Sequence, residues 1–216
     1  MNTESGMTAT ELRAGVTLAF VFFLRMLALF LVLPVLSIYA TEFHDATPVL
    51  VGLALGIYGL SQALLQIPFG MLSDRWDRKP VIILGLVIFV CGSVIAGYAS
   101  SIYFIIAGRA LQGAGAIAAA VMALAADLTS EEQRTKAMAV IGMSVGVAFS
   151  LAFVVGPPLS AVIGVNGLFF FSALLACIAI GVLVTLVPHS DTHRIHADTE
   201  LMTTQLLRVL KNRDLL

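Results

Sequence analysis

Residues 14–40 read AGVTLAFVFFLRMLALFLVLPVLSIYA, an apolar run that holds a single charge, Arg25. About 20 consecutive apolar residues suffice to cross the hydrocarbon core of a bilayer. The run is too long for the apolar region of a signal peptide, and Ile38 occupies the place where a small residue would have to precede cleavage after Ala40. We therefore expect residues 14–40 to be a membrane-spanning helix that stays in the mature chain.

The rest of the chain repeats this pattern. Its 216 residues are 59% hydrophobic and 12% charged, whereas a soluble domain is about 25% charged. The composition excludes an ordinary water-soluble fold and predicts an all-α membrane protein. Apolar runs bounded by charges or turn residues predict six transmembrane helices. They lie at residues 14–40, 49–70, 80–99, 102–126, 137–162 and 164–187.

The basic residues indicate the orientation. The connections 41–48, 100–101 and 163 contain no Lys or Arg, and of the 12 basic residues all but Arg25 and Arg109 lie on the other side. Basic loops stay in the cytoplasm, so we expect both termini there. The expected organisation is a cytoplasmic N-terminus at 1–13, a six-helix bundle at 14–187 and a cytoplasmic segment at 188–216. Leucines and basic residues near its end predict an amphipathic helix, and the net charge of −1 predicts no nucleic-acid partner.

Two charges lie inside the predicted spans, Arg25 and Arg109. A charge within a span costs about 2.5–3.5 kcal/mol on insertion scales and marks a functional site by default. Gln112 follows Arg109 at i+3, on the same helix face. Two interpretations remain open for each arginine: a clamp on backbone carbonyls of a neighbouring helix, or a wall of a water-filled pathway.

A polar stripe marks the second predicted helix, where Tyr58, Gln62 and Gln66 recur every four residues. Such a stripe faces either a cavity or a partner helix. No Asp or Glu lies within the hydrophobic centre of any predicted span, although proton-driven transport commonly uses a buried carboxylate as its titrating group. The candidates for a transport pathway are Arg25, Tyr58, Gln62, Arg109 and Gln112.

Small residues indicate where the helices pack closely. Gly113 and Gly115 lie in the fourth predicted span, and a small residue at each turn lets another helix backbone approach. Pro157 and Pro158 are expected to bend the fifth span, because proline removes a backbone hydrogen bond. In that span small residues recur every four positions, at Ser144, Ala148, Ala152, Gly156, Ser160 and Gly164.

Two patterns typical of chemical sites are interpreted as coincidental. Gly142–Gly146 matches the G-x-S-x-G pattern of hydrolases, which requires a strand–turn–helix elbow and a nearby histidine. All four histidines lie outside the predicted spans, so we expect no enzyme activity. His189, Asp191, His193 and His196 have spacings found in metal sites but belong to a polar segment, so we expect neither a metal nor a cofactor.

The connection at residues 70–80 reads GMLSDRWDRKP and carries five charges. It resembles the loop signature of the major facilitator superfamily, G-x-L-a-D-r-x-G-r-k, except that Asp77 stands where the pattern has Gly. The fourth span is similar to the family signature R-x-x-Q-G-x-G, and an acidic-x6-Arg pair follows it. Gly156-Pro157 resembles part of the antiporter signature, with Ala152 and Ser160 in place of glycines. The matched residues of the first three signatures are Gly70, Leu72, Asp74, Arg75, Arg78, Lys79, Gly108, Arg109, Gln112, Gly113, Gly115, Asp127 and Arg134.

Within this superfamily, the chain resembles the proton-coupled drug-efflux branch and its YajR-like group. The resemblance implies twelve helices in two halves, each built from two inverted three-helix repeats, with this chain similar to the amino-terminal half. It implies secondary active transport by alternating access, with proton-coupled efflux of small lipophilic or amphipathic compounds across the bacterial inner membrane. The implied partners are the lipid bilayer, a small-molecule substrate, and a missing C-terminal six-helix half or a second copy.

The resemblance also implies roles for the charged connections. Residues Gly70, Asp74, Arg75, Arg78 and Lys79 would form a conformational-switch loop, in which Asp74 latches onto a helix end of the other half in the outward-facing state. Arg78 would complete a charge cluster with Asp127 and Arg134. A proton gradient is the suspected coupling agent. The alternative is a non-transporting truncated or half-size subunit that must pair with another six-helix half.

Overall fold

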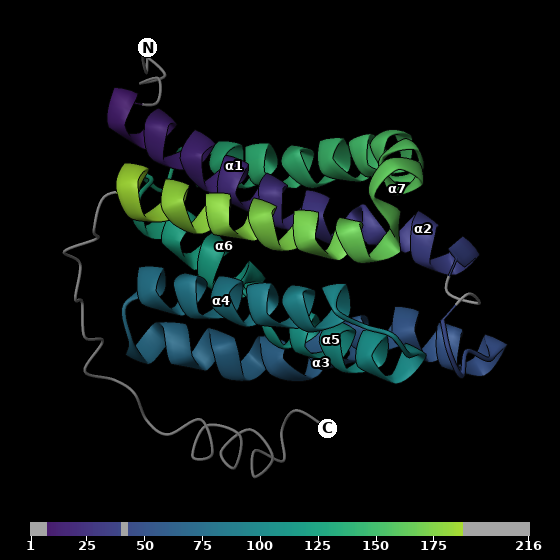
Figure 1. Ribbon diagram of the computed structural model, residues 1–216. Coiled ribbons are helices and arrows are strands. Elements are labelled where there is room, and N and C mark those ends of the chain that lie inside the picture. The colour runs from purple at the N-terminus through teal and green to yellow at the C-terminus, as the bar shows by residue number, and fades with distance from the viewer. Residues whose placement is uncertain (1–7, 40–42, 188–216) are drawn as a thin grey trace, which may run out of the picture.

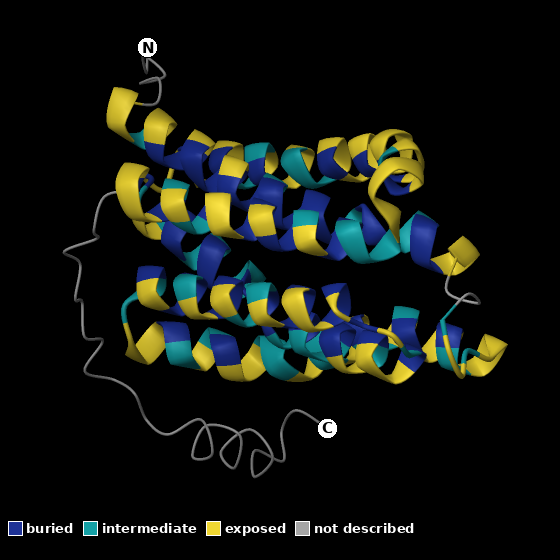
Figure 2. Cartoon of the chain, in the orientation of Figure 1, coloured by how far each residue is buried: buried dark blue, intermediate teal, exposed yellow. Residues whose placement is uncertain are grey.

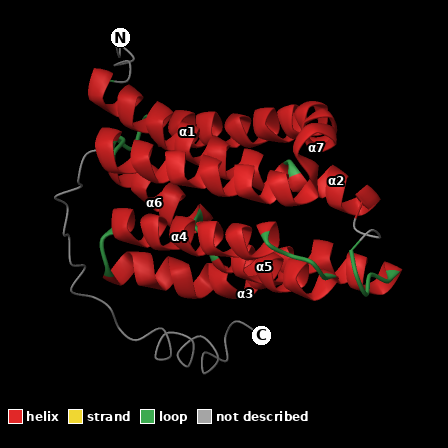
Figure 3. Cartoon of the chain, viewed as in Figure 1, coloured by secondary structure: helices red, strands yellow, loops and turns green. Residues whose placement is uncertain are grey.

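The computed structural model describes residues 8–39 and 43–187 as a bundle of helices (Figure 1). Among these residues the only β contact is an isolated bridge between His44 and Ser101, and Figure 3 shows helices joined by short loops. The helices are α1 (Ala9–Phe30), α2 (Val32–Tyr39), α3 (Pro48–Arg75), α4 (Arg78–Gly97), α5 (Ile102–Ala114), α6 (Ala118–Asp127) and α7 (Arg134–Leu186). The expected amphipathic helix and the histidines after residue 188 lie outside the described residues.

Helix α1 begins at a cap that the sequence provides. The Thr8 hydroxyl accepts a hydrogen bond from the Glu11 N–H, and the Glu11 carboxylate accepts one from the Thr8 N–H at 2.9 Å. This reciprocal capping box starts the helix at Ala9 rather than at residue 14. Pro34 has no N–H to donate to the carbonyl of Phe30, where α1 ends and α2 follows after Leu31.

The expectation of one continuous helix at 102–126 is wrong, because the structure divides this segment into two helices. Helix α5 ends at Ala114, residues 115–117 are not helical, and α6 begins at Ala118. The backbone of Gly115 lies at φ −75° and ψ 58°, outside the helical region. The break leaves carbonyl groups of α5 without their helical partners in the middle of an apolar bundle.

Helix α7 doubles back on itself (Figure 1). Its 53 residues are divided at Gly164, whose φ of 70° and ψ of 176° are not helical. A positive φ combined with a ψ near 180° is essentially restricted to glycine, so this residue permits the reversal next to the connection expected at 163. The backbone stays helical through Pro157 and Pro158. The interruption therefore lies next to the connection expected at 163, and both prolines lie inside the helix that precedes it.

The helices pack in two layers (Figure 1). Helix α1 packs along α7, while α3 and α4 pack against α5, and α4 also contacts α7 and joins the layers. Most of α1 is buried, whereas α3 is mainly exposed (Figure 2). Five helical segments of the described chain are long and apolar enough to cross a membrane: Ala9–Tyr39, Pro48–Arg75, Arg78–Gly97, Ile102–Asp127 and Arg134–Leu186, the last divided at Gly164.

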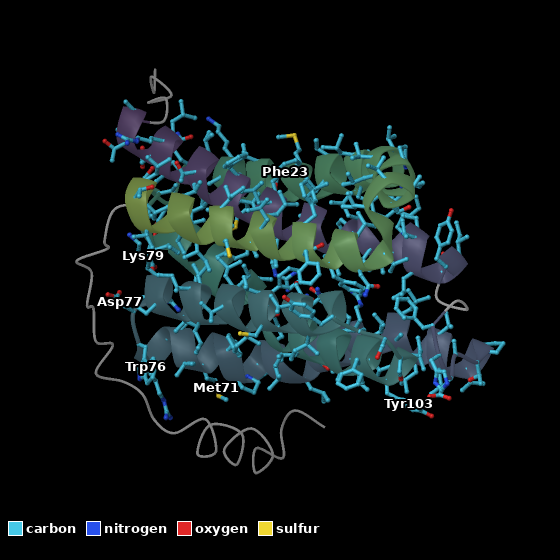
Figure 4. The ribbon with its side chains drawn as sticks, viewed as in Figure 1. Phe23, Met71, Trp76, Asp77, Lys79 and Tyr103 are labelled. Carbon is cyan, nitrogen blue, oxygen red and sulfur yellow. The ribbon has the colours of Figure 1, made fainter. Side chains whose placement is uncertain are left out.

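Successive connections lie at opposite ends of the bundle. Figure 4 places Trp76, Asp77 and Lys79 at one end and Tyr103 near the other. The Ser130 N–H donates to the Glu11 carboxylate at 2.8 Å, which brings the connection before α7 beside the start of α1. At the far end the Asn166 amide donates to the Ala99 carbonyl at 3.0 Å. This alternation agrees with consecutive apolar spans running in opposite directions.

Glycines permit the close approach of α3, α4 and α5. A Cβ built on Gly92 would lie 2.6 Å from the Gly108 carbonyl oxygen, and a Cβ on Gly108 would lie 2.7 Å from the Gly92 carbonyl oxygen. A Cβ on Gly113 would collide with the backbone of Tyr58, and one on Gly115 with the backbone of Gly85. These positions accept no side chain without a shift of backbone, as the small-residue pattern predicts.

Replacement of Gly113 by Ala is expected to destabilise the bundle by about 1–3 kcal/mol, the usual cost of an overpacked contact. Gly146 is the matched control, because an added Cβ there meets no atom within 4 Å. Gly146→Ala should be neutral or stabilising by up to about 1 kcal/mol, since alanine restricts the unfolded chain. Thermal unfolding in detergent, followed by circular dichroism, measures both effects. Equal stabilities of the two variants would contradict the packing assignment.

Candidate functional site

Arg25 lies in the middle of the bundle, only 2% exposed. Its Nη2 donates to the Tyr58 hydroxyl at 3.0 Å, to the Gln112 carbonyl at 3.2 Å and to the Gly115 carbonyl at 3.4 Å. Two of these acceptors are backbone carbonyls of α5 and of the break that follows it. Arg25 therefore has the clamp geometry that one of the two interpretations of the sequence requires.

Arg109 lies on α5 and is fully buried. Its Nη1 donates to Gln112 Oε1 at 3.0 Å, and the two side chains lie on one helix face, as their i+3 spacing predicts. Gln112 Nε2 in turn donates to the hydroxyl of Ser93 on α4 at 2.7 Å. Through its backbone carbonyl, Gln112 also accepts from Arg25 at 3.2 Å. Gln112 thus connects both arginines and joins α5 to α1 and α4.

Aromatic rings surround the two guanidinium groups. The Arg25 Cζ lies 3.8 Å from the centre of the Phe89 ring and 5.7 Å from that of Tyr58, and the Arg109 Cζ lies 4.7 Å from the Tyr58 ring. The face of an aromatic ring attracts a cation. The Tyr58 ring therefore attracts both charges, while their mutual repulsion remains.

Several donors of this cluster have no partner among the described residues. They are Nε and Nη1 of Arg25 and Nε and Nη2 of Arg109, all buried. A buried donor without a partner costs about 1–3 kcal/mol, and more when it is charged. Unpaired charged donors at the centre of a membrane bundle are therefore expensive, and they distinguish this cluster from an ordinary packing contact.

Of the five pathway candidates, the structure brings four together: Arg25, Tyr58, Arg109 and Gln112. Gln62 is half-buried one helical turn along α3 from Tyr58, and its Oε1 has no partner among the described residues. Gln66, one further turn along α3, is also half-buried, and its Oε1 also has no partner among the described residues. The two glutamines extend the polar stripe of α3 beyond the two-arginine cluster.

A second charged group lies at the end of the bundle that carries Trp76 and Lys79. Arg78 forms an ion pair with Asp74, donates from Nε to Asp127 Oδ2 at 3.1 Å and from Nη1 to the Ser73 hydroxyl at 3.1 Å. Arg78 thus links the end of α3, the start of α4 and the end of α6. Gly70, one turn before Asp74, has room for a side chain, with Ala119 Cβ 3.7 Å from a built Cβ.

The remaining basic residues of this end have separate positions. Lys79 is buried and donates from Nζ to the carbonyls of Val184 at 3.2 Å and Val187 at 2.7 Å, near the C-terminal end of α7. Arg134 donates to the Ala126 carbonyl at 3.2 Å and lies 4.0 Å from Glu131. Arg134 therefore borders the Arg78 cluster through backbone contact. Arg75 is exposed at the end of α3.

Asp77 replaces the glycine of the family signature without strain. It precedes the first residue of α4 with φ −63° and ψ 138°, an extended conformation that any residue adopts. The turn at this position therefore needs no glycine. The Asp77 side chain caps no N–H of α4.

The small residues of α7 that precede Gly164 face α1 and the start of α2. Ala148, Ala152, Gly156 and Ser160 are buried. A Cβ on Gly156 would lie 3.0 Å from the Leu31 carbonyl oxygen and 3.6 Å from the Pro34 ring. Pro157, beside it, is exposed. The four-residue pattern thus marks a surface packed on α1 and α2.

Sequence reasoning missed three members of these groups: Ser93, Phe89 and Ser73. Ser93 is the one hydroxyl-bearing residue within 80–97, and an isolated polar side chain in an apolar span could have identified it. Phe89 resembles any other apolar residue of its span, so no signal in the sequence separates it. Ser73 could be identified as a hydrogen-bond partner only from the position of the Arg78 side chain.

Known proteins resemble the whole described bundle. The inner membrane transport protein YajR of Escherichia coli K12 is 50% identical over 210 residues, which cover 97% of this chain and 46% of YajR. The class B tetracycline resistance protein of Escherichia coli is 30% identical over 176 residues, covering 79% of this chain and 43% of that protein. The chain spans about half the length of the curated relatives it matches.

The fold is also found in solved structures. The human organic anion transporter MFSD10 superposes with a TM-score of 0.67 at 25% identity, over 85% of this chain and 49% of that one. The family model described as Major Facilitator Superfamily matches residues 18–215. This match covers nearly all of the bundle described above, with its divided fourth span and its charged loop. The chain belongs to the Major Facilitator Superfamily.

Proposed function

We propose that this chain is a six-helix half of a secondary active transporter, which works by alternating access and exports small lipophilic or amphipathic compounds in exchange for protons. The observation that carries the proposal is the buried cluster of Arg25, Tyr58, Arg109 and Gln112. Polar and charged side chains inside a membrane bundle are costly and line substrate or ion pathways. Their position beside a discontinuous helix is a feature of transporter binding sites.

The proposed topology has six membrane crossings, with α7 making two. A straight helix of 53 residues would be about 80 Å long, more than twice the thickness of the hydrocarbon core. The reversal at Gly164 fits two crossings of ordinary length. The basic residues at the ends of α3, α4 and α7 support a cytoplasmic location for both termini. The likeness to an inner membrane protein supports the bacterial inner membrane as the location.

The charged loop supports alternating access. In the proposed mechanism, Asp74, Arg78, Asp127 and Arg134 hold the cytoplasmic ends of α3, α4, α6 and α7 together in the outward-facing state. Asp74 is 68% exposed and paired with Arg78 on one side only, so its carboxylate is available to a helix end of another half. Rocking of the two halves would break this contact and open the cytoplasmic side.

The export direction and the substrate class are supported by names and by surface chemistry. A relative is named for tetracycline resistance. Phe30, Phe149 and Phe153 form a chain of ring contacts across α1 and α7, at centroid distances of 5.2 and 4.6 Å. Phe149 and Phe153 are each 46% exposed and offer apolar surface to a lipophilic compound.

Proton coupling in this proposal needs a titrating group beyond the described helix interiors. Every Asp and Glu of residues 8–39 and 43–187 lies in a connection or within the first or last turn of a helix. A carboxylate of the partner half would supply the group. A non-transporting subunit is the second candidate, because the described helix interiors hold no Asp or Glu that could titrate.

The first prediction concerns transport. Inverted membrane vesicles that contain this chain together with its other six-helix half are expected to accumulate a lipophilic fluorescent dye when a proton gradient is imposed, and a protonophore should abolish the accumulation. Arg109→Ala is expected to reduce the initial rate by about tenfold or more, because it removes a buried charge of the pathway. Arg13→Ala is the matched control, since Arg13 is exposed on α1, and should retain the wild-type rate. Dye fluorescence measures both.

Two results would count against this assignment. Wild-type transport by Arg109→Ala would exclude a pathway role for Arg109. Vesicles that show no proton-dependent accumulation, while circular dichroism shows a folded protein, would favour the non-transporting subunit.

The second prediction concerns the charged loop. Asp74→Asn removes one charged partner of Arg78. The ratio of outward- to inward-facing molecules is expected to change by a factor of about 2–5, because an exposed ion pair contributes about 0.4–1 kcal/mol. The Asp74→Asn variant should transport more slowly as a result. Spin-label distances across the cytoplasmic ends measure the populations. Asp77→Asn, in the same loop, should change neither quantity, and an Asp74→Asn variant that behaves like it would remove Asp74 from the switch.

A further inference from the structure

The two-arginine cluster carries more positive charge than its surroundings balance. In residues 8–39 and 43–187, the ion pairs of Arg and Lys with Asp or Glu all lie near the ends of helices, and none includes Arg25 or Arg109. The oxygens that contact these two arginines belong to a hydroxyl, an amide and backbone carbonyls, all uncharged. Buried charges in proteins are normally paired. This cluster is therefore short of negative charge.

The unpaired donors of Arg109 form a fork. Nη1 is engaged by Gln112, which leaves Nε and Nη2. These two nitrogens lie on the same edge of the planar guanidinium and present parallel N–H groups, the arrangement that binds both oxygens of one carboxylate. The edge of Arg109 that lacks a partner is thus the edge that suits a carboxylate best.

Arg25 adds a second set of donors. Its Nη2 is occupied by Tyr58 and the carbonyls of the α5 break, while Nε and Nη1 have no partner among the described residues. The Tyr58 ring lies near both guanidinium groups, at 4.7 Å from Arg109 and 5.7 Å from Arg25. Both guanidinium groups thus lie beside the Tyr58 ring, in the region where α1, α3 and α5 meet.

The walls of this region are apolar and aromatic. Phe89 is fully buried with its ring 3.8 Å from Arg25, and Tyr58 is 6% exposed. The free edge of Arg109 matches the two oxygens of one carboxylate, and the rings of Tyr58 and Phe89 offer apolar contact to the body that carries it. The environment therefore favours a single negative charge carried by an organic group with an apolar or aromatic body.

We propose that Arg109 and Arg25 recognise the carboxylate of an amphipathic organic acid. The carboxylate accepts two N–H groups from the Arg109 fork and a third from Arg25, while the organic body contacts the rings of Tyr58 and Phe89. The proposal deepens the transport function and rests on it, because the buried site opens to a ligand through the helix movements of alternating access.

The test is equilibrium binding of radiolabelled benzoate to this chain together with its other six-helix half in lipid nanodiscs at neutral pH, with empty nanodiscs correcting for partition into lipid. Benzamide has the same shape and no charge, and inorganic phosphate has charge without the ring. Wild-type protein is expected to bind benzoate saturably. Benzamide and phosphate should compete about tenfold or more weakly, since each lacks part of the recognised chemistry.

The variants Arg109→Lys and Arg25→Lys keep the buried charges and so limit the risk of misfolding, which circular dichroism checks. Arg109→Lys loses the two-pronged contact and is expected to weaken benzoate binding about tenfold. Arg25→Lys should weaken it less. Arg13→Lys, on the exposed face of the same helix as Arg25, should leave it unchanged.

The proposal is overturned if wild-type protein binds no benzoate saturably, if benzamide or phosphate competes as well as benzoate, or if Arg109→Lys binds as tightly as Arg13→Lys. The proton-driven dye assay separates this failure from a failure of the transport function. Dye transport without benzoate binding would refute the carboxylate site alone. Arginine-dependent benzoate binding without transport of dye or benzoate would refute the transport function and leave a carboxylate-binding subunit.

Discussion

The contact between Arg25 Nη2 and the carbonyls of Gln112 and Gly115 supports the interior of this bundle. A helix break inside hydrocarbon leaves backbone groups unsatisfied, at several kcal/mol each. A guanidinium in the same place lacks the water that would hydrate it. Each group supplies what the other needs, so the break after Ala114 and the burial of Arg25 depend on one another.

Small residues let the surrounding helices come close enough for that contact. Gly113 allows α5 to approach the backbone of Tyr58, and the reciprocal pair of Gly92 and Gly108 brings α4 against α5. Tyr58 and Ser93 reach Arg25 and Gln112 only because these backbones are close. Membrane helices lack a hydrophobic driving force toward one another, so such packing and hydrogen bonds hold them together.

The central cluster and the charged end share two helices. Helix α3 carries Tyr58 in its middle and Asp74 in its last turn, while α4 begins with Arg78 and carries Phe89 and Ser93 further along. Arg78 joins these two helices to α6 through Asp127. A displacement of α3 or α4 at one place therefore moves both groups, and this connection gives the proposed substrate site a physical route to the proposed switch.

Apolar length, charge placement and small-residue spacing in the sequence predict the membrane fold and the alternation of the connections. They also identify Arg25, Tyr58, Arg109 and Gln112 as polar residues inside apolar spans. These features depend on local composition and helical periodicity alone. The tertiary structure decided the break at Gly115 and the partners of Arg78, Lys79 and Arg134. Each of these depends on a side chain or carbonyl that another helix presents. A helix signal in the sequence carries no information about a guanidinium some 90 residues away along the chain, so only packing could place Arg25 against the break.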